Sequence, residues 1–184
     1  FPYHFRGPRN ISKEEYGELC VAKFARLFET EYNGVWDAKA GQCEYAAFYV
    51  EPIQGTGGYV IPPPNLFTGL KKVLDDYGIL LVVDEIQMGF FRTGKMWAME
   101  HFDIAPDIIV FGKALTNGMN PLSGIWAREE LISPAAFGPG PPHSTVSSNT
   151  LGQATGLAVM EIFKDGNYDI SFAAKGRNLH AGRA

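Results

Sequence analysis

The sequence is poor in cysteine, in long apolar runs and in clustered basic residues. Its 184 residues include two cysteines, Cys20 and Cys43, with no partner at metal-ligand or Cys-x-x-Cys spacing, so we expect free, buried thiols. No apolar run approaches the about 18 to 20 residues that span a bilayer, and no signal peptide is recognisable. Lys and Arg number 16 against 20 Asp and Glu, without a dense basic run, which argues against nucleic-acid or membrane binding. We therefore expect a cytoplasmic globular protein.

The N-terminal part of the sequence predicts a helix. Ser12 and Glu15 have the spacing of a capping box, in which each residue satisfies a backbone N–H of the other. The pattern continues to about residue 33, and four apolar residues are expected near one face. They are Leu19, Phe24, Leu27 and Phe28.

A short apolar run, 46–50, and a continuous aliphatic run, 79–83, flank a second predicted helix. This helix begins at Asn65 and ends at Gly78, a residue type common just after helix ends. Runs that are apolar on both faces are typical of parallel strands covered by helices. The order strand, helix, strand therefore predicts a βαβ unit with a right-handed crossover.

The second half of the sequence adds two strands and a helix. A strand is expected at 108–111. The run at 122–127 follows too closely for a helical crossover, so we expect it to be an antiparallel partner. Residues 151–163 predict a helix. The fold class is expected to be α/β, a three-layer sandwich around a mainly parallel sheet.

Polar residues follow three of the predicted strands. Glu51, Asp84 and Lys113 each lie at the end of a predicted strand, and ligands bind at the carboxyl ends of the strands in open α/β sheets. Gln87 lies about one turn beyond Asp84. An amine, a carboxylate and an amide are therefore expected in one crevice. From spacing alone, a structural ion pair between Asp84 and Lys113 is an open alternative.

Two other groups of residues fit a ligand less well. His101, Asp103 and Asp107 do not have the spacing of a compact metal site, so we expect no metal. The glycines of residues 55–58 lack the Gly-x-Gly-x-x-Gly frame of a phosphate loop.

The sequence around these strand ends resembles the signature of the class III aminotransferases. The matching stretches are 82–94 (VVDEIQMGFFRTG) and 106–115 (PDIIVFGKAL), with shorter matches at 51–55 (EPIQG) and 143–145 (HST). The resemblance runs from the first residues to about Phe163. It implies a pyridoxal-phosphate enzyme of fold type I, related to ornithine, acetylornithine and 4-aminobutyrate aminotransferases.

The resemblance implies a role for each polar residue. Lys113 would form the Schiff base with pyridoxal 5′-phosphate and then shuttle the proton, and Asp84 would hold the pyridine nitrogen protonated. Gln87 would donate a hydrogen bond to the phenolic oxygen of the cofactor. Thr145 would bind the cofactor phosphate across the interface of a homodimer or a dimer of dimers. A structural role is expected for Glu51 and for Arg92.

The sequence departs from the family pattern in three respects. Thr56 stands where relatives that use glutamate-like partners often have an acid, and 146–150 reads VSSNT where the family more often has Phe-Gly-Gly-Asn-Pro. Family members are also more than twice as long. Residues 1–184 are therefore expected to be the central part of the large domain, without the N-terminal segment and the C-terminal small domain.

Three functions remain open on this reading. The first is transfer of an amino group from an amino acid or amine to a 2-oxo acid by ping-pong exchange through pyridoxamine phosphate. The second is an amino-acid racemase, epimerase or decarboxylase on the same scaffold. The third, of another class, is an inactive truncated fragment that acts only as a binding module.

Overall fold

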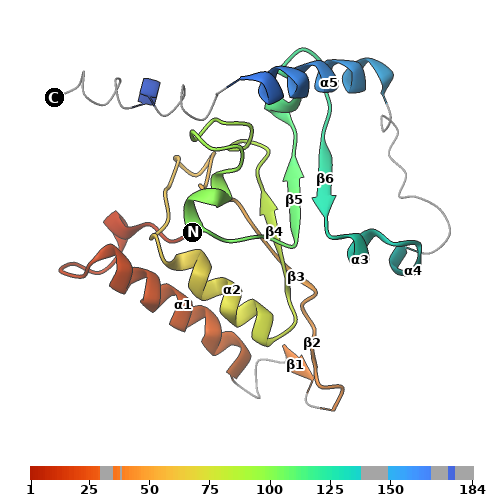
Figure 1. Cartoon of the computed structure of the whole chain (residues 1–184). Coiled ribbons are helices and arrows are strands. Elements are labelled where there is room, and N and C mark those ends of the chain that lie inside the picture. The colour runs from red at the N-terminus through yellow and green to blue at the C-terminus, as the bar shows by residue number, and fades with distance from the viewer. Residues whose placement is uncertain (30–34, 38, 138–148, 167–173, 177–184) are drawn as a thin grey trace. The chain divides into compact units, whose positions relative to one another are not determined.

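The chain divides into two compact units. The computed structural model describes residues 1–29, 35–37, 39–137, 149–166 and 174–176 (Figure 1). The first unit comprises Phe1–Val83 and Met99–Pro106, and the second comprises Asp84–Ala98 and Asp107–Ala184. None of the helices in the described parts combines the length and apolar character that a bilayer crossing requires.

Helix α1 (Lys13–Glu29), in the first unit, begins at the predicted capping box and follows the short 3-10 helix η1 (His4–Arg6). The backbone N–H of Ser12 donates to Glu15 Oε2 at 2.6 Å, and the backbone N–H of Glu15 donates to Ser12 Oγ at 3.1 Å. The start of the helix is thus confirmed, whereas residues 30–33 of the predicted helix lie outside the described residues.

The buried face of α1 differs in part from the predicted one. Phe24 and Phe28 contact the core as expected, but Leu19 and Leu27 are 36% and 47% exposed. The residues of α1 that face the core recur at intervals of three and four residues, as in an amphipathic helix. These residues are Gly17, Cys20, Val21, Phe24 and Phe28.

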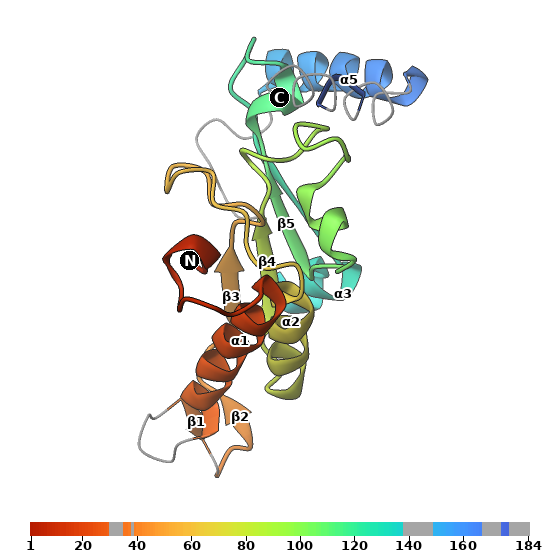
Figure 2. The same cartoon turned by 90° about the vertical axis from the view of Figure 1, so that its left-hand side faces the viewer.

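The predicted βαβ unit is present in the order β3 (Ala47–Val50), α2 (Leu66–Asp76) and β4 (Leu80–Asp84). Strands β3 and β4 are parallel, in a register that runs from Ala47 opposite Leu80 to Val50 opposite Val83. Helix α2 lies beside α1 in both Figure 1 and Figure 2. A Cβ on Gly69 would come within 2.6 Å of Val21 Cγ2, so this helix contact requires a glycine.

The core of the first unit lies between the two helices and β4. It includes Phe67, Leu74 and Leu81, all of which are fully buried. A small antiparallel pair, β1 (Trp36–Asp37) and β2 (Gln42–Cys43), adds to this unit, and the 3-10 helix η2 (Ala98–Phe102) supplies the buried Met99. Cys20 and Cys43 are free thiols as expected, but both are half-buried rather than fully buried.

The second unit contains an antiparallel strand pair. Strand β5 (Ile108–Phe111) pairs with β6 (Gly124–Ala127), in a register from Ile108 opposite Ala127 to Phe111 opposite Gly124. The predicted antiparallel partner is therefore confirmed. The 3-10 helix η3 (Lys113–Thr116) joins the two strands, and the short helices α3 (Glu129–Ile132) and α4 (Pro134–Phe137) follow β6.

Helix α5 (Thr150–Asp165) packs against the turn that joins β5 and β6. Asn149 caps the helix by accepting a hydrogen bond from the backbone N–H of Leu151 at 3.2 Å. The Asn120 amide donates to Thr155 Oγ1 at 3.0 Å, which ties the turn to the helix. The predicted helix at 151–163 is thus present, and it holds the segment that follows Lys113.

Candidate active site

Lys113 lies directly beyond β5, at the point where the strand becomes η3. The preceding Gly112 is extended, and a Cβ at this position would come within 3.3 Å of Leu122 O and Ser123 Cβ. A side chain there would press on the segment that leads into β6, so a glycine allows the chain to turn directly into Lys113. The backbone N–H of Leu115 donates to Gly112 O at 3.0 Å and closes this turn.

The backbone of Lys113 is strained. Its φ is +43°, in the left-handed region that residues with a Cβ seldom adopt. The side chain is exposed, and across the described residues its ammonium group has no hydrogen bond or ion pair. A strained backbone that presents an amine to solvent is more typical of a functional residue than of a structural one.

Asp84 belongs to the same unit as Lys113 and lies at the end of a neighbouring strand. It is the last residue of β4, is half-buried, and accepts a hydrogen bond at Oδ1 from the backbone N–H of Ile86 at 3.0 Å. The backbone N–H of the next residue, Glu85, donates to Val110 O in β5 at 2.9 Å. Asp84 and Lys113 therefore leave from strand ends that lie side by side.

Gln87 is half-buried in the turn that follows β4. The backbone N–H of Gly89 donates to Glu85 O at 2.8 Å, which closes the turn around Gln87. Phe90 and Phe91 follow with φ of +58° and +64°. Phe90 is buried and its ring lies 5.1 Å from that of Trp97, so it packs inside the unit.

The remaining predicted site residues are Glu51, Thr145 and Arg92. Glu51 is in the first unit, where its Oε2 accepts a hydrogen bond from the backbone N–H of Gly55 at 2.8 Å, in keeping with a structural role. Thr145 lies outside the described residues. Arg92 is exposed and, within the described ranges, makes no hydrogen bond or ion pair that would support the structural role expected for it.

The metal alternative finds no support in the described residues. No group of three or more His, Cys, Asp or Glu side chains is arranged there to hold an ion. Asp107 instead receives a hydrogen-bonded ion pair from Arg128 Nη2 at 3.1 Å, which joins the start of β5 to the end of β6.

A cavity of about 380 Å³ lies beside η3 in the second unit. Ala114 and Asn117 of the lysine-bearing turn line it, together with Phe90, Arg92 and the apolar end of α5. Its walls contain residues adjacent to Lys113 but not Lys113 itself. The cavity therefore borders the turn that carries Lys113, without the lysine among its wall residues.

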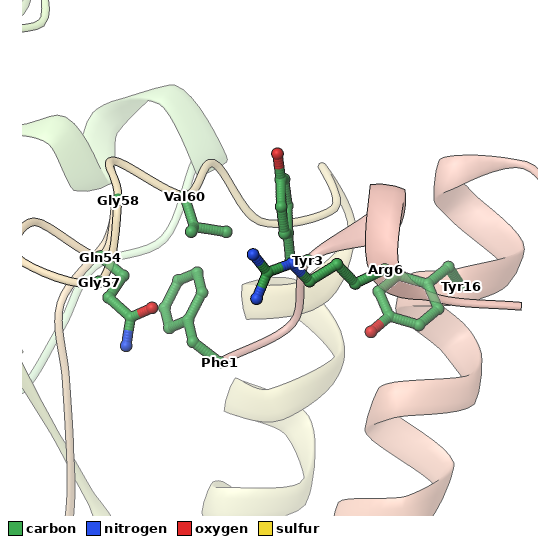
Figure 3. A pocket seen from close by; sticks show the side chains of 8 residues that line it. All are labelled: Phe1, Tyr3, Arg6, Tyr16, Gln54, Gly57, Gly58 and Val60. Atoms are coloured by element: carbon green, nitrogen blue, oxygen red, sulfur yellow. The ribbon is translucent and has the colours of Figure 1, made fainter.

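The first unit has a separate cavity of about 310 Å³, shown in Figure 3. Phe1, Tyr3 and Arg6 line one part of it, and Arg6 lies over the Tyr3 ring at 5.8 Å. Burial raises the pKa of Tyr16, a further wall residue, and Cys20 adds to this effect, so the phenol stays protonated at neutral pH. None of the predicted site residues lines this cavity.

The donor set of the second unit fits a cofactor with an aldehyde and a basic ring nitrogen. An accessible amine can bind an aldehyde covalently, a carboxylate can pair with a protonated ring nitrogen, and a neutral amide can donate to a phenolic oxygen. Lys113, Asp84 and Gln87 supply one of each, in one compact unit. These three residue types are therefore chemically compatible with pyridoxal phosphate.

Comparison with known proteins gives the family. Residues 10–182 match the family described as Aminotransferase class-III. A protein described as a probable 4-aminobutyrate aminotransferase of Bacillus subtilis is 36% identical over 165 residues, which are 90% of this chain and 35% of that protein. The chain belongs to the class III aminotransferases, whose members are pyridoxal-phosphate-dependent.

Solved structures agree with this assignment. An (S)-enantioselective omega-transaminase from Thermomicrobium roseum superposes with a TM-score of 0.77 at 32% identity, covering 88% of this chain and 35% of that one. An ornithine aminotransferase from Toxoplasma gondii superposes with a TM-score of 0.61 at 38% identity. The match covers 65% of this chain and 28% of that one. The predicted α/β fold of type I is thus confirmed. The chain spans about a third of the length of these relatives.

One residue of the site carries no role in the sequence-based prediction. Glu85 follows Asp84 in the matching stretch, yet a charged residue after a strand is ordinarily solvated. In the structure it is fully buried, and its carboxylate accepts a hydrogen bond from the backbone N–H of Ala98 at 3.1 Å. The signal available in the sequence was its position between two site residues, Asp84 and Gln87.

Proposed function

We propose that the protein carrying this chain is a pyridoxal-phosphate-dependent aminotransferase that moves an amino group from an amino acid or amine to a 2-oxo acid. The observation that carries the proposal is the placement of Lys113 and Asp84 at adjacent strand ends of one unit, in a chain of the class III family. When bound, the cofactor supplies an aldehyde that takes up the amino group and a ring that withdraws electrons from the reacting carbon.

Lys113 is the residue that would hold the cofactor and move the proton. Its amine would bind the cofactor aldehyde, and after the substrate amine has displaced it, the same amine would carry a proton away from the substrate carbon. Its exposed position supports this role, because the amine must be reachable by both cofactor and substrate.

Asp84 and Gln87 would set the electronic state of the cofactor. The Asp84 carboxylate would keep a proton on the ring nitrogen, in a charge-assisted hydrogen bond worth about 1.5–3 kcal/mol. Gln87 would donate to the phenolic oxygen, for which a neutral donor is suitable. Thr145 would donate to the cofactor phosphate from the second subunit of a homodimer.

The chain itself would be the central part of a large domain. The relatives that it matches extend well beyond the matched residues, which cover 35% of the Bacillus protein. We infer that further segments complete the cofactor site and supply most of the substrate pocket. A cytoplasmic location is part of the same proposal.

The test uses the intact protein loaded with pyridoxal phosphate. Incubation with an amino donor and no acceptor should bleach the visible band of the cofactor, because the aldehyde form is converted to the amine form. A later addition of a 2-oxo acid should restore the band. Lys113→Ala should abolish borohydride fixation of the cofactor and reduce turnover by several orders of magnitude, while Lys72→Ala, at an exposed position of α2, serves as control. A wild-type protein that takes up no cofactor would refute the proposal.

A racemase is the second candidate, because one relative carries that activity in its name. An alanine/serine racemase of Pyrococcus horikoshii is 45% identical over 124 residues, which are 67% of this chain and 25% of that protein. A racemase would keep the visible band in the experiment above and would invert the stereochemistry of the amino acid. Chiral analysis of the amino acid recovered from the same incubation separates the two functions.

A further inference from the structure

We propose that Glu85 is a positioning residue that holds Asp84 and Gln87 in place for the cofactor. This inference rests on the proposed function, since it assigns a role toward the same site. Glu85 is fully buried although it carries a carboxyl group, and buried carboxyl groups are rare unless the structure uses their hydrogen bonds.

Glu85 joins three parts of the second unit. Its backbone N–H donates to Val110 O in β5 at 2.9 Å, and its backbone carbonyl accepts from Gly89 N at 2.8 Å. Its side-chain Oε2 accepts from the backbone N–H of Ala98 at 3.1 Å. Glu85 is therefore bonded to the strand that leads to Lys113, to the turn that contains Gln87, and to Ala98.

The side-chain bond has a particular consequence for the loop 86–97. It connects the residue before the loop to the residue after it, so that the loop leaves and returns at a fixed separation. A second bond, from Phe90 N to Met96 O at 2.7 Å, closes the loop further inside. Without the Glu85 bond, the separation between the two ends of the loop would be less tightly fixed, and Gln87 lies in its first turn.

Strain in the loop makes this anchor necessary. Phe90 and Phe91 both have φ in the left-handed region, which is unfavourable for aromatic residues and persists only where the surroundings enforce it. The packing of Phe90 against Trp97 and the bond from Glu85 to Ala98 enforce it from two sides. We expect loss of the bond to let the loop relax and to displace Gln87 and Asp84 from the cofactor.

The test compares two variants of similar shape in the intact holoenzyme. Glu85→Gln retains an oxygen that can accept from Ala98, whereas Glu85→Met retains the length of the side chain without an acceptor. For Glu85→Met we expect a kcat about 10- to 100-fold lower per bound cofactor, because small displacements of catalytic groups have effects of this order. We also expect a changed pH profile of the visible cofactor band. In the Glu85→Gln variant, kcat and the pH profile of the band should both stay close to those of the wild type.

Two further measurements keep the result interpretable. Glu161→Met makes the same change at an exposed carboxylate on α5 and should leave the spectrum and kcat unchanged. If Glu85→Met does not fold, Glu85→Asp, which is one methylene shorter, should show the same loss of kcat and the same spectral change.

The outcomes separate this inference from the proposed function. Wild-type kcat and a wild-type band in folded Glu85→Met or Glu85→Asp would overturn the positioning role while the enzyme remains an aminotransferase. A lower yield of folded protein with unchanged kcat per cofactor would overturn it as well, because it would show a structural role only. A wild-type protein without cofactor binding would instead refute the proposed function.

Discussion

The left-handed backbone of Lys113 leads to a prediction in which glycine stabilises the protein. We compare Lys113→Gly with Lys113→Ala in the cofactor-free protein, so that both variants lack the amine and differ only by a Cβ. At φ of +43° the Cβ costs about 1–2 kcal/mol, whereas glycine costs about 0.5–1 kcal/mol more in conformational entropy on folding. The glycine variant should therefore be more stable by about 0.5–1 kcal/mol.

A matched pair at Lys72 should give the opposite sign. Lys72 is exposed in the interior of α2, where helical backbone favours alanine over glycine by about 1 kcal/mol. Urea unfolding of all four variants measures both differences. With slopes of about 1–3 kcal/mol per molar urea, the midpoints should differ by roughly 0.2–1 M for the pair at position 113 and by roughly 0.3–1 M for the pair at position 72.

The result that would refute this reasoning is an alanine variant at position 113 that equals or exceeds the glycine variant in stability. It would mean that the backbone relaxes once the lysine is removed, so that the surroundings do not enforce the left-handed conformation. The strain would then belong to the lysine itself rather than to the turn between β5 and η3.

Two further predictions concern the first unit. The backbone N–H and the hydroxyl of Ser12 hold the pKa of Glu15 below its usual value of 4.5, so the stability that its charge contributes is present above that value and is lost as the pH falls through the lower, folded-state pKa. Glu15→Gln should be less stable than wild type at neutral pH, and the gap in unfolding midpoint should close in acid; a gap that widens in acid would contradict this. Leu81→Ala, at a fully buried position, should cost about 2–5 kcal/mol in urea unfolding, and a loss below 1 kcal/mol would show that the core collapses around the cavity.

Local patterns in the sequence were sufficient to predict most of the elements. The capping box of Ser12 and Glu15 needs only neighbours in the chain, and it forms where it was expected. The short gap before β6 excludes a crossover helix, and the strand pairs with β5 in the antiparallel sense. The buried face of α1 was predicted less well, because Leu19 and Leu27 are exposed in the described structure, where the sequence pattern placed them on the apolar face.

The candidate site also has features that the sequence indicated and features that it did not. The residue types at the predicted strand ends suggested Asp84, Gln87 and Lys113 as a group, which stays a prediction. The motif around them indicated the family, which the comparisons confirm. The strain at Lys113 and the burial of Glu85 were not visible in the sequence. The side-chain bond of Glu85, for example, is made to Ala98, which lies 13 residues further along the chain.

The sequence alone determined the order of strands and helices, the donor groups and the family of this protein, since periodicity, turn chemistry and motif spacing are properties of neighbouring residues. Tertiary structure decided which carboxyl group is solvated and which is buried, and which backbone positions are strained. Burial and strain arise when distant segments pack against one another and restrict each other, and no local pattern encodes that restriction.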